Sequence, residues 1–134
     1  MKVWINGTFD VLHRGHIELF RYAYGFGDVR VGIDTDERVK KLKGNDRPVN
    51  KFEDRKTFLE SIKFIDSVVG FSSDEELEEQ IKSYQPNYMV IGSDYKDKKV
   101  IGSEFVKNLI FFDRIENFST TNIINGKTLQ SKKN

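Results

Sequence analysis

The sequence contains no cysteine and only two prolines. Without cysteine the chain has no disulfide, no thiol nucleophile and no thiolate metal ligand, which fits a reducing compartment. No apolar run approaches the roughly 20 residues that a membrane helix needs, and the longest are short stretches such as Tyr88–Ile91. The first residues lack the apolar core of a signal peptide, so we expect a cytoplasmic protein with no membrane partner.

A strong excess of one charge is also missing, because the formal net charge is only +1. The composition therefore does not favour nucleic acid as a partner. A chain of 134 residues with 37% apolar residues predicts one globular domain, which we place at residues 1–126, with residues 127–134 as a frayed tail. The positive charge is concentrated in what we call the basic segment, residues 38–47. It contains Arg38, Lys40, Lys41, Lys43 and Arg47. Such a run is usually a solvated surface, and the alternative is a site for a small anion.

Apolar patterning predicts alternating strands and helices. Strands are expected at residues 3–5, 29–33, 68–69, 88–91 and 109–112. Helices are expected from about residues 16, 50 and 121 and at 74–84, with a short helix near 104–107. The basic segment is expected to be a loop that runs to Pro48, and Asn50 with Glu53 resembles a capping box. Alternation of this kind implies parallel pairing through right-handed crossovers. The predicted fold is therefore α/β, with a doubly wound five-stranded parallel sheet.

The turn after the first expected strand carries the most unusual residues. Ligands of doubly wound sheets bind beyond the carboxyl ends of the strands, and Gly7–His16 lies at such an end. Gly7 allows close backbone approach, and His13 and His16 lie on one side of a helix N-terminus, where free N–H groups suit phosphate. A metal site or a structural role are the alternatives for the histidines, although no third metal ligand is evident.

The stretch GTFDVLHRGH at Gly7–His16 resembles the HxGH signature of the cytidylyltransferase-like nucleotidylyltransferases. Ser119–Thr121 resembles their second signature, so the likeness runs from about Val3 to Ile124. It implies a Rossmann-like fold and an enzyme that moves a nucleoside monophosphate from an NTP to a phosphorylated small molecule. Mg²⁺ would arrive with the NTP, and no resident metal site is expected. Related enzymes are homodimers that use a segment similar to Lys63–Asp66.

The resemblance assigns roles to individual residues. The catalytic residues would be His13, His16 and Lys43. Nucleotide would be bound by Gly7, Thr8, Phe9, Gly15, Asp94, Tyr95, Arg114, Ser119 and Thr120. Acceptor or triphosphate would be bound by Asp10, Asp36, Lys41 and Arg55. Capping a turn or a helix is the alternative role for Asp94, Ser119 and Thr120.

Two branches of the family are similar to the chain. Lys41–Arg55, Gly92–Glu104 and Ser119–Ile124 resemble the adenylyltransferase domain of the heptose-phosphate enzymes of lipopolysaccharide core synthesis. Gly7–His13, Thr35–Glu37 and Arg114 resemble glycerol-3-phosphate cytidylyltransferase. The longer matches favour ATP as the donor and a sugar 1-phosphate as the acceptor, with CTP and glycerol 3-phosphate as the alternative. A nucleotide-binding regulator without catalysis is the alternative from another class.

Overall fold

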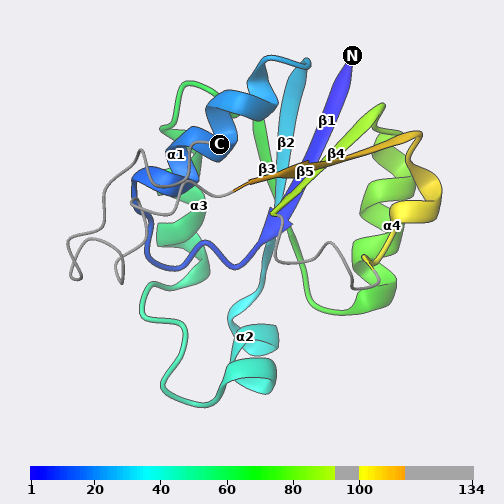
Figure 1. The fold of residues 1–134 in the computed structure, drawn as a ribbon. Helices are drawn as coiled ribbons and strands as arrows, with labels where there is room; N and C mark the ends of the chain where they lie inside the picture. The colour runs from blue at the N-terminus through cyan, green and yellow to red at the C-terminus, as the bar shows by residue number, and fades with distance from the viewer. Residues whose placement is uncertain (93–99, 114–134) are drawn as a thin grey trace.

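The computed structural model describes residues 1–92 and 100–113, which form layers of helix, sheet and helix (Figure 1). The strands are β1 (Lys2–Gly7), β2 (Asp28–Asp34), β3 (Ser67–Phe71), β4 (Tyr88–Gly92) and β5 (Asn108–Phe112). The helices are α1 (Arg14–Tyr24), α2 (Asp36–Lys43), α3 (Phe52–Glu60), α4 (Asp74–Tyr84) and the 3₁₀ turn η2 (Ser103–Phe105). The expected last helix near Thr121 and the tail at 127–134 lie outside the described residues.

The strands form one parallel sheet in the order β3-β2-β1-β4-β5. Helices α1 and α3 cover one face and α4 covers the other, as Figure 1 shows. The predicted doubly wound parallel sheet is therefore confirmed. The strand order reverses between β1 and β4, and a crevice for a ligand opens at that point in sheets of this kind.

Alternate residues of the central strand β1 supply both halves of the core. Val3 and Ile5 pack in a cluster with Phe20 of α1, whereas Trp4 packs in a second cluster with Ile81 of α4. All five side chains are at most 2% exposed. Burial of such side chains contributes roughly 1.5–3 kcal/mol each, so β1 stabilises the packing on both faces of the sheet.

Gly32 interrupts the apolar run of β2 because the indole of Trp4 occupies the space beside it. A Cβ on Gly32 would lie 2.5 Å from Trp4 Cζ2, which no relaxed structure tolerates. The indole Nε1–H donates to Asn6 Oδ1 at 2.8 Å, which satisfies its buried polar end.

The prediction that the basic segment is a loop was wrong over its first half, because residues 36–43 form α2. Thr35 caps this helix, since its hydroxyl accepts from Arg38 N at 3.4 Å. Acidic residues in the first turn and lysines in the last turn complement the helix dipole. Only Val39 of this helix is buried. The sequence therefore lacks the repeating apolar positions from which a helix is predicted.

The predicted capping box at Asn50 and Glu53 was also wrong. The N-cap of α3 is Lys51, whose side chain makes no cap hydrogen bond. Instead the free N–H of Phe52 donates to the carboxylate of Asp36 at 2.8 Å. Asn50 bonds elsewhere, because its Nδ2 donates to the carbonyl of Asp10 at 2.7 Å. Tertiary partners thus replace the local cap.

Candidate active site

A cleft of about 640 Å³ lies at the carboxyl end of the sheet, beside the point where the strand order reverses. The turn after β1 lines one side of it through Gly7, Thr8, Phe9, Asp10 and Val11, together with His16 and Leu19 of α1. The opposite sides are lined by Asp34, Arg38, Leu42, Lys43, Arg47, Phe71, Leu77, Val90, Ile91, Gly92, Val100 and Ile101. Most residues that the sequence analysis assigned to the turn after β1 therefore meet at one cleft.

His13 and His16 are held as a pair at the N-terminus of α1. Their rings lie 4.1 Å apart between centroids, at an interplanar angle of 37°. His13 is the N-cap, and its Nδ1 accepts from Gly15 N at 3.0 Å. The N–H of His13 in turn donates to Nδ1 of His16 at 3.1 Å. This is a capping box built from two imidazoles, and it explains the spacing of the two histidines.

These two hydrogen bonds also decide which ring nitrogen carries the proton. A backbone N–H is always a donor, so the Nδ1 atoms of His13 and His16 must be acceptors. In the neutral imidazole the proton then lies on Nε2, which makes Nε2–H the donor that each ring presents. The helix N-terminus adds partial positive charge at the same place. The pair is built to donate hydrogen bonds to an anionic group.

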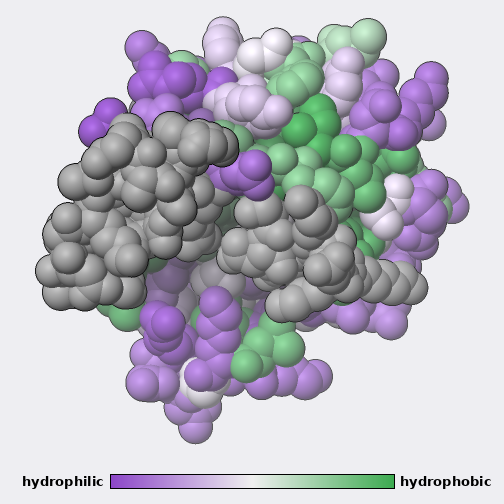
Figure 2. All heavy atoms as spheres, viewed as in Figure 1, coloured by the Kyte–Doolittle hydropathy of each residue, from purple (hydrophilic) through white to green (hydrophobic). Residues whose placement is uncertain are grey.

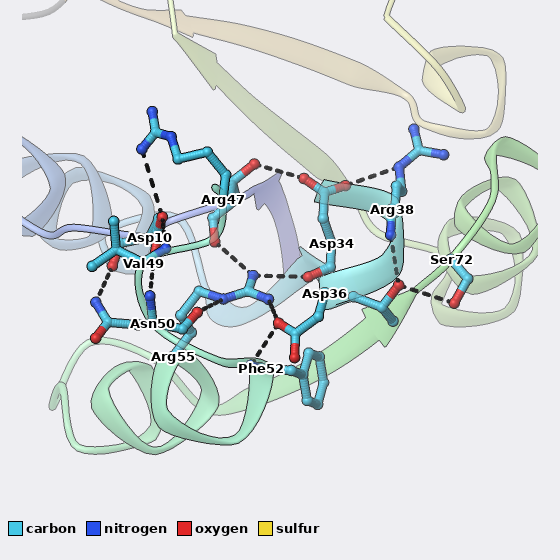
Figure 3. A network of polar contacts seen from close by, with 12 residues as sticks. Asp10, Asp34, Asp36, Arg38, Arg47, Val49, Asn50, Phe52, Arg55 and Ser72 are labelled. Carbon is cyan, nitrogen blue, oxygen red and sulfur yellow. Dashed lines mark hydrogen bonds and ion pairs between the residues drawn. The ribbon is translucent and has the colours of Figure 1, made fainter. Parts of the chain in front are cut away.

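Arg55 lies behind the turn after β1 and is 0% exposed. Its Nη1 donates to the carbonyls of Thr8 at 3.1 Å and Asp34 at 2.8 Å, and its Nε donates to the carbonyl of Asn50 at 2.9 Å. Its Nη2 pairs with the carboxylate of Asp36 at 2.8 Å. We call these five residues the Arg55 network (Figure 3). One guanidinium thus joins three segments that border the cleft.

Asp10 was expected to contact acceptor or triphosphate, and the structure places it where the turn after β1 meets the start of α3. Its carboxylate accepts from Val49 N at 2.7 Å and from Asn50 N at 2.8 Å. Arg47 lies 3.7 Å from the same carboxylate and is 44% exposed (Figure 3). The carboxylate of Asp36 is likewise engaged by Phe52 N and by Arg55.

Arg38 and Asp34 line the cleft. Arg38 was expected to belong to a possible anion site only as part of the basic segment, and Asp34 was not expected at the site. Arg38 Nε donates to Asp34 at 2.9 Å and Nη2 donates to Asp74 at 2.8 Å, while Thr8 Oγ1 donates to the other oxygen of Asp34 at 2.7 Å. Burial lowers the pKa of Arg38, but the hydrogen bonds to Asp74 and Asp34 outweigh it and raise the pKa. The i,i+4 spacing of Asp34 and Arg38 was the available signal, and it is visible only once α2 is recognised as a helix.

Lys43 ends α2 and lines the cleft with an exposed side chain. Among residues 1–92 and 100–113, no ion pair holds its ammonium group. Lys41 is exposed on the same helix but does not line the cleft. Figure 2 shows that the region of α2 is mainly hydrophilic. The sequence-predicted residues Asp94, Tyr95, Arg114, Ser119 and Thr120 lie outside the described residues.

Residues 1–92 and 100–113 contain no group of three or more side chains able to hold a metal ion. None of the helices in these ranges has the length and apolar character to span a bilayer.

Comparisons with known proteins agree with this architecture. Residues 4–126 match the cytidylyltransferase-like family. The chain is 47% identical over 124 residues to the bifunctional protein HldE of Campylobacter fetus, covering 92% of this chain and 27% of that protein. It is 42% identical over 133 residues to HldE of Campylobacter concisus, covering 98% of this chain and 28% of that protein. The chain thus spans about a quarter of the length of these relatives.

Solved structures show the same fold at low sequence identity. A lipopolysaccharide core biosynthesis protein from Thermoplasma volcanium superposes with a TM-score of 0.67 at 20% identity, covering 84% of this chain and 96% of that one. A protein of unknown function from Archaeoglobus fulgidus superposes with a TM-score of 0.56 at 20% identity, covering 96% of this chain and 84% of that one. The chain belongs to the cytidylyltransferase-like family. The match to this family and the likeness to the HldE relatives support nucleotidylyltransferase activity.

Proposed function

We propose that the chain transfers adenosine monophosphate from ATP to the phosphate of a sugar 1-phosphate, such as heptose 1-phosphate. A phosphate oxygen of the acceptor attacks the α-phosphorus of the NTP. The bond from the α-phosphorus to the bridging oxygen breaks, and pyrophosphate leaves with that electron pair. The observation that carries the proposal is the His13 and His16 pair at the N-terminus of α1. The Nδ1 atom of each ring accepts from a backbone N–H, and His16 lines the cleft.

The reaction needs positioning and positive charge more than proton removal. A phosphate monoester has its second pKa near about 6, so the acceptor is already a dianion at neutral pH and needs no general base. Negative charge grows on the α-phosphate and on the leaving pyrophosphate, where fixed N–H donors stabilise it most. His13 and His16 act in this way in our proposal, with no role as bases.

Lys43 would add a mobile charge to these fixed donors. Its ammonium group stands at the edge of the cleft on the last turn of α2, with Arg47 a few residues further on. Both side chains are exposed. Lys43 can turn toward a triphosphate without giving up an ion pair with a described residue, whereas Arg47 would leave the Asp10 carboxylate. Mg²⁺ bound to the phosphates of the NTP would complete the neutralisation.

The choice of ATP and a sugar phosphate rests on likeness of sequence. HldE relatives from several bacteria match over at least 91% of this chain. The stretches Lys41–Arg55 and Gly92–Glu104 resemble the heptose-phosphate branch, whereas Arg114 and Thr35–Glu37 resemble the glycerol-3-phosphate branch. Base choice through hydrogen bonds to the base edge gives large discrimination, so one NTP should dominate.

The test is a panel of four NTPs, each assayed with heptose 1-phosphate and with glycerol 3-phosphate by release of pyrophosphate. We expect the highest kcat/KM with ATP and heptose 1-phosphate. A tenfold preference for CTP would move the chain to the glycerol-3-phosphate branch. Binding of NTP without turnover on any acceptor would identify a nucleotide-binding regulator instead.

We further propose that the chain forms a homodimer through the segment Lys63–Asp66. Supporting this, Phe64 lies in an aromatic group on the α1 and α3 face, with Tyr24 at 5.7 Å and Arg21 at 5.0 Å from its ring. Tyr24 is 50% exposed, so a second copy would bury apolar surface here. Sedimentation at micromolar concentration decides between dimer and monomer.

A further inference from the structure

Phe9, in the turn after β1, has a backbone conformation that side chains rarely adopt. Its φ is 49°, in the left-handed region. The other described non-glycine residue with a positive φ is Gln85, which ends α4 as a left-handed C-cap, a common place for that conformation. Phe9 ends no helix. Strain of this kind persists only where the surrounding structure imposes it.

The residues on both sides of Phe9 are fixed by hydrogen bonds. Before it, the carbonyl of Thr8 accepts from the buried guanidinium of Arg55 at 3.1 Å. After it, the carbonyl of Asp10 accepts from Asn50 Nδ2 at 2.7 Å. The carboxylate of Asp10 accepts from two backbone N–H groups of the loop between α2 and α3. The Arg55 network and Asp10 therefore hold the turn in the one shape that requires a left-handed residue.

That shape places the Phe9 ring against His16. The two ring centroids lie 5.5 Å apart with an interplanar angle of 86°, an edge-to-face contact, and Phe20 supports the Phe9 ring at 5.2 Å. The ring also lies close to Gly7, where an added Cβ would be 3.1 Å from two Phe9 ring atoms, a tight contact. The space that the sequence analysis reserved for a ligand is thus partly occupied by the Phe9 ring.

We propose that Phe9 is a positioning residue that keeps the His16 imidazole turned so that its Nδ1 meets the N–H of His13 and its Nε2–H points at the reacting phosphate. The hydrogen bond from His13 fixes one edge of the ring at 3.1 Å, and the Phe9 ring blocks rotation away from it. The inference rests on the role proposed above for His16. The resemblance implied that Phe9 contacts the nucleotide directly. In this inference Phe9 instead acts by orienting the His16 ring.

The two roles predict different kinetics. A residue that positions a group acting in the transition state lowers kcat when it is truncated, because small misplacements of a catalytic group cost much of its effect. A residue that binds nucleotide equally in ground and transition states raises KM instead. We expect Phe9→Leu to lower kcat about tenfold with the KM for ATP changed by less than about threefold.

A measurement on the ligand-free protein tests the same inference without turnover. The chain has two histidines, so ¹⁵N-labelled histidine gives one pair of ring nitrogen signals for each. In the unaltered protein both rings should show a single Nε2–H tautomer. In Phe9→Leu the His16 signals should move toward a mixture of tautomers, while those of His13 keep their pattern.

Phe26→Leu is the matched control. Phe26 is also half-buried and packs on aromatic rings, 5.0 Å from Tyr88, but it lies at the amino end of β2, away from the cleft. It should leave kcat and both histidine patterns unchanged. If Phe9→Leu does not fold, Phe9→Met makes the same test, since its flexible side chain fills irregular space.

A His16 that keeps a single Nε2–H tautomer in the folded Phe9 variant overturns the inference, as does a rise in KM at unchanged kcat. Failure of the proposed function is distinguishable from either result. If the unaltered protein transfers no nucleotide, kcat and KM cannot be compared between variants. The tautomer measurement still decides whether Phe9 positions His16.

Discussion

Arg55 and Lys43 are cations beside the same cleft, and the resemblance assigned both of them to phosphate groups. Arg55 is 0% exposed, and its guanidinium is engaged by three backbone carbonyls and one carboxylate. Lys43 is exposed, and the described residues offer its ammonium group no ion pair. The charge of Arg55 is paired within the protein, whereas the ammonium group of Lys43 is accessible to a ligand.

The difference follows from the chemistry of the two head groups. A guanidinium has five N–H donors in a planar fork, so it can join several diverging acceptors at once. An ammonium group is a compact, strongly hydrated charge on a flexible stem, suited to follow a phosphate as it moves. The arginine therefore shapes the cleft, and the lysine is available to act in it. The predictions for Arg55 and Lys43 test this division, and one for His16 tests the fixed donors beside them.

The largest expected effect is that of Arg55→Lys on folding. Lysine cannot reach the carbonyls of Thr8, Asp34 and Asn50 together, so buried acceptors lose their partners, and the free energy of unfolding should fall by about 3–5 kcal/mol. Urea denaturation measures this. Arg21→Lys is the control, because that side chain is 58% exposed and a lysine can still pair with Glu18 and lie over the Phe64 ring, so its effect should stay within about 0.5 kcal/mol. Full stability combined with weaker acceptor binding would restore the ligand role to Arg55.

The second effect is that of His16 on catalysis. His16→Ala should lower kcat by about 100-fold or more, equivalent to about 2.7 kcal/mol, with little change in the affinity for NTP. His16→Asn is the informative partner, because an amide oxygen can still accept from the N–H of His13 while no group replaces Nε2–H. Both variants should be equally slow. Near-normal turnover in His16→Asn would show that Nε2–H is not the donor.

The smallest effect concerns Lys43. Lys43→Ala should lower kcat/KM about tenfold, or about 1.4 kcal/mol, while the free energy of unfolding changes by less than about 0.5 kcal/mol. Lys40→Ala is the control, because Lys40 is exposed on the same helix and does not line the cleft. In the unaltered protein, trypsin cleavage after Lys43 should slow when ATP and Mg²⁺ are added, relative to cleavage after Lys82 of α4. An equal fall in kcat/KM in the two alanine variants would show that Lys43 has no specific role at the site.

The fold was predictable because its signals are local. Short apolar runs separated by turn residues gave all five strands, and their alternation with helices gave the parallel sheet. The failures lie where local signals are weak. Helix α2 buries only Val39, so charge pattern and a Thr35 cap hold it without an apolar stripe. The N-terminus of α3 is capped by Asp36, a residue distant in sequence, and not by Asn50.

The candidate site divides in the same way. The histidine turn was visible in the sequence because its parts are consecutive: a glycine, two histidines and a helix start within ten residues, Gly7–His16. The Arg38–Asp34–Asp74 contacts were not, because they join the end of β2 to the start of α4. The left-handed φ of Phe9 was also hidden, since it depends on Arg55 and Asn50 from another loop.

The sequence by itself determined the five strands, the parallel α/β sheet and the place of the histidine pair, because periodicity and helix-start chemistry act over a few neighbouring residues. Only the tertiary structure decided which charges are available to a ligand. Basic residues look alike along the chain, but folding takes Arg55 out of water, where it must be paired, and leaves Lys43 in water, where it need not be. Burial is a property of the packed molecule, and it separates these two cations.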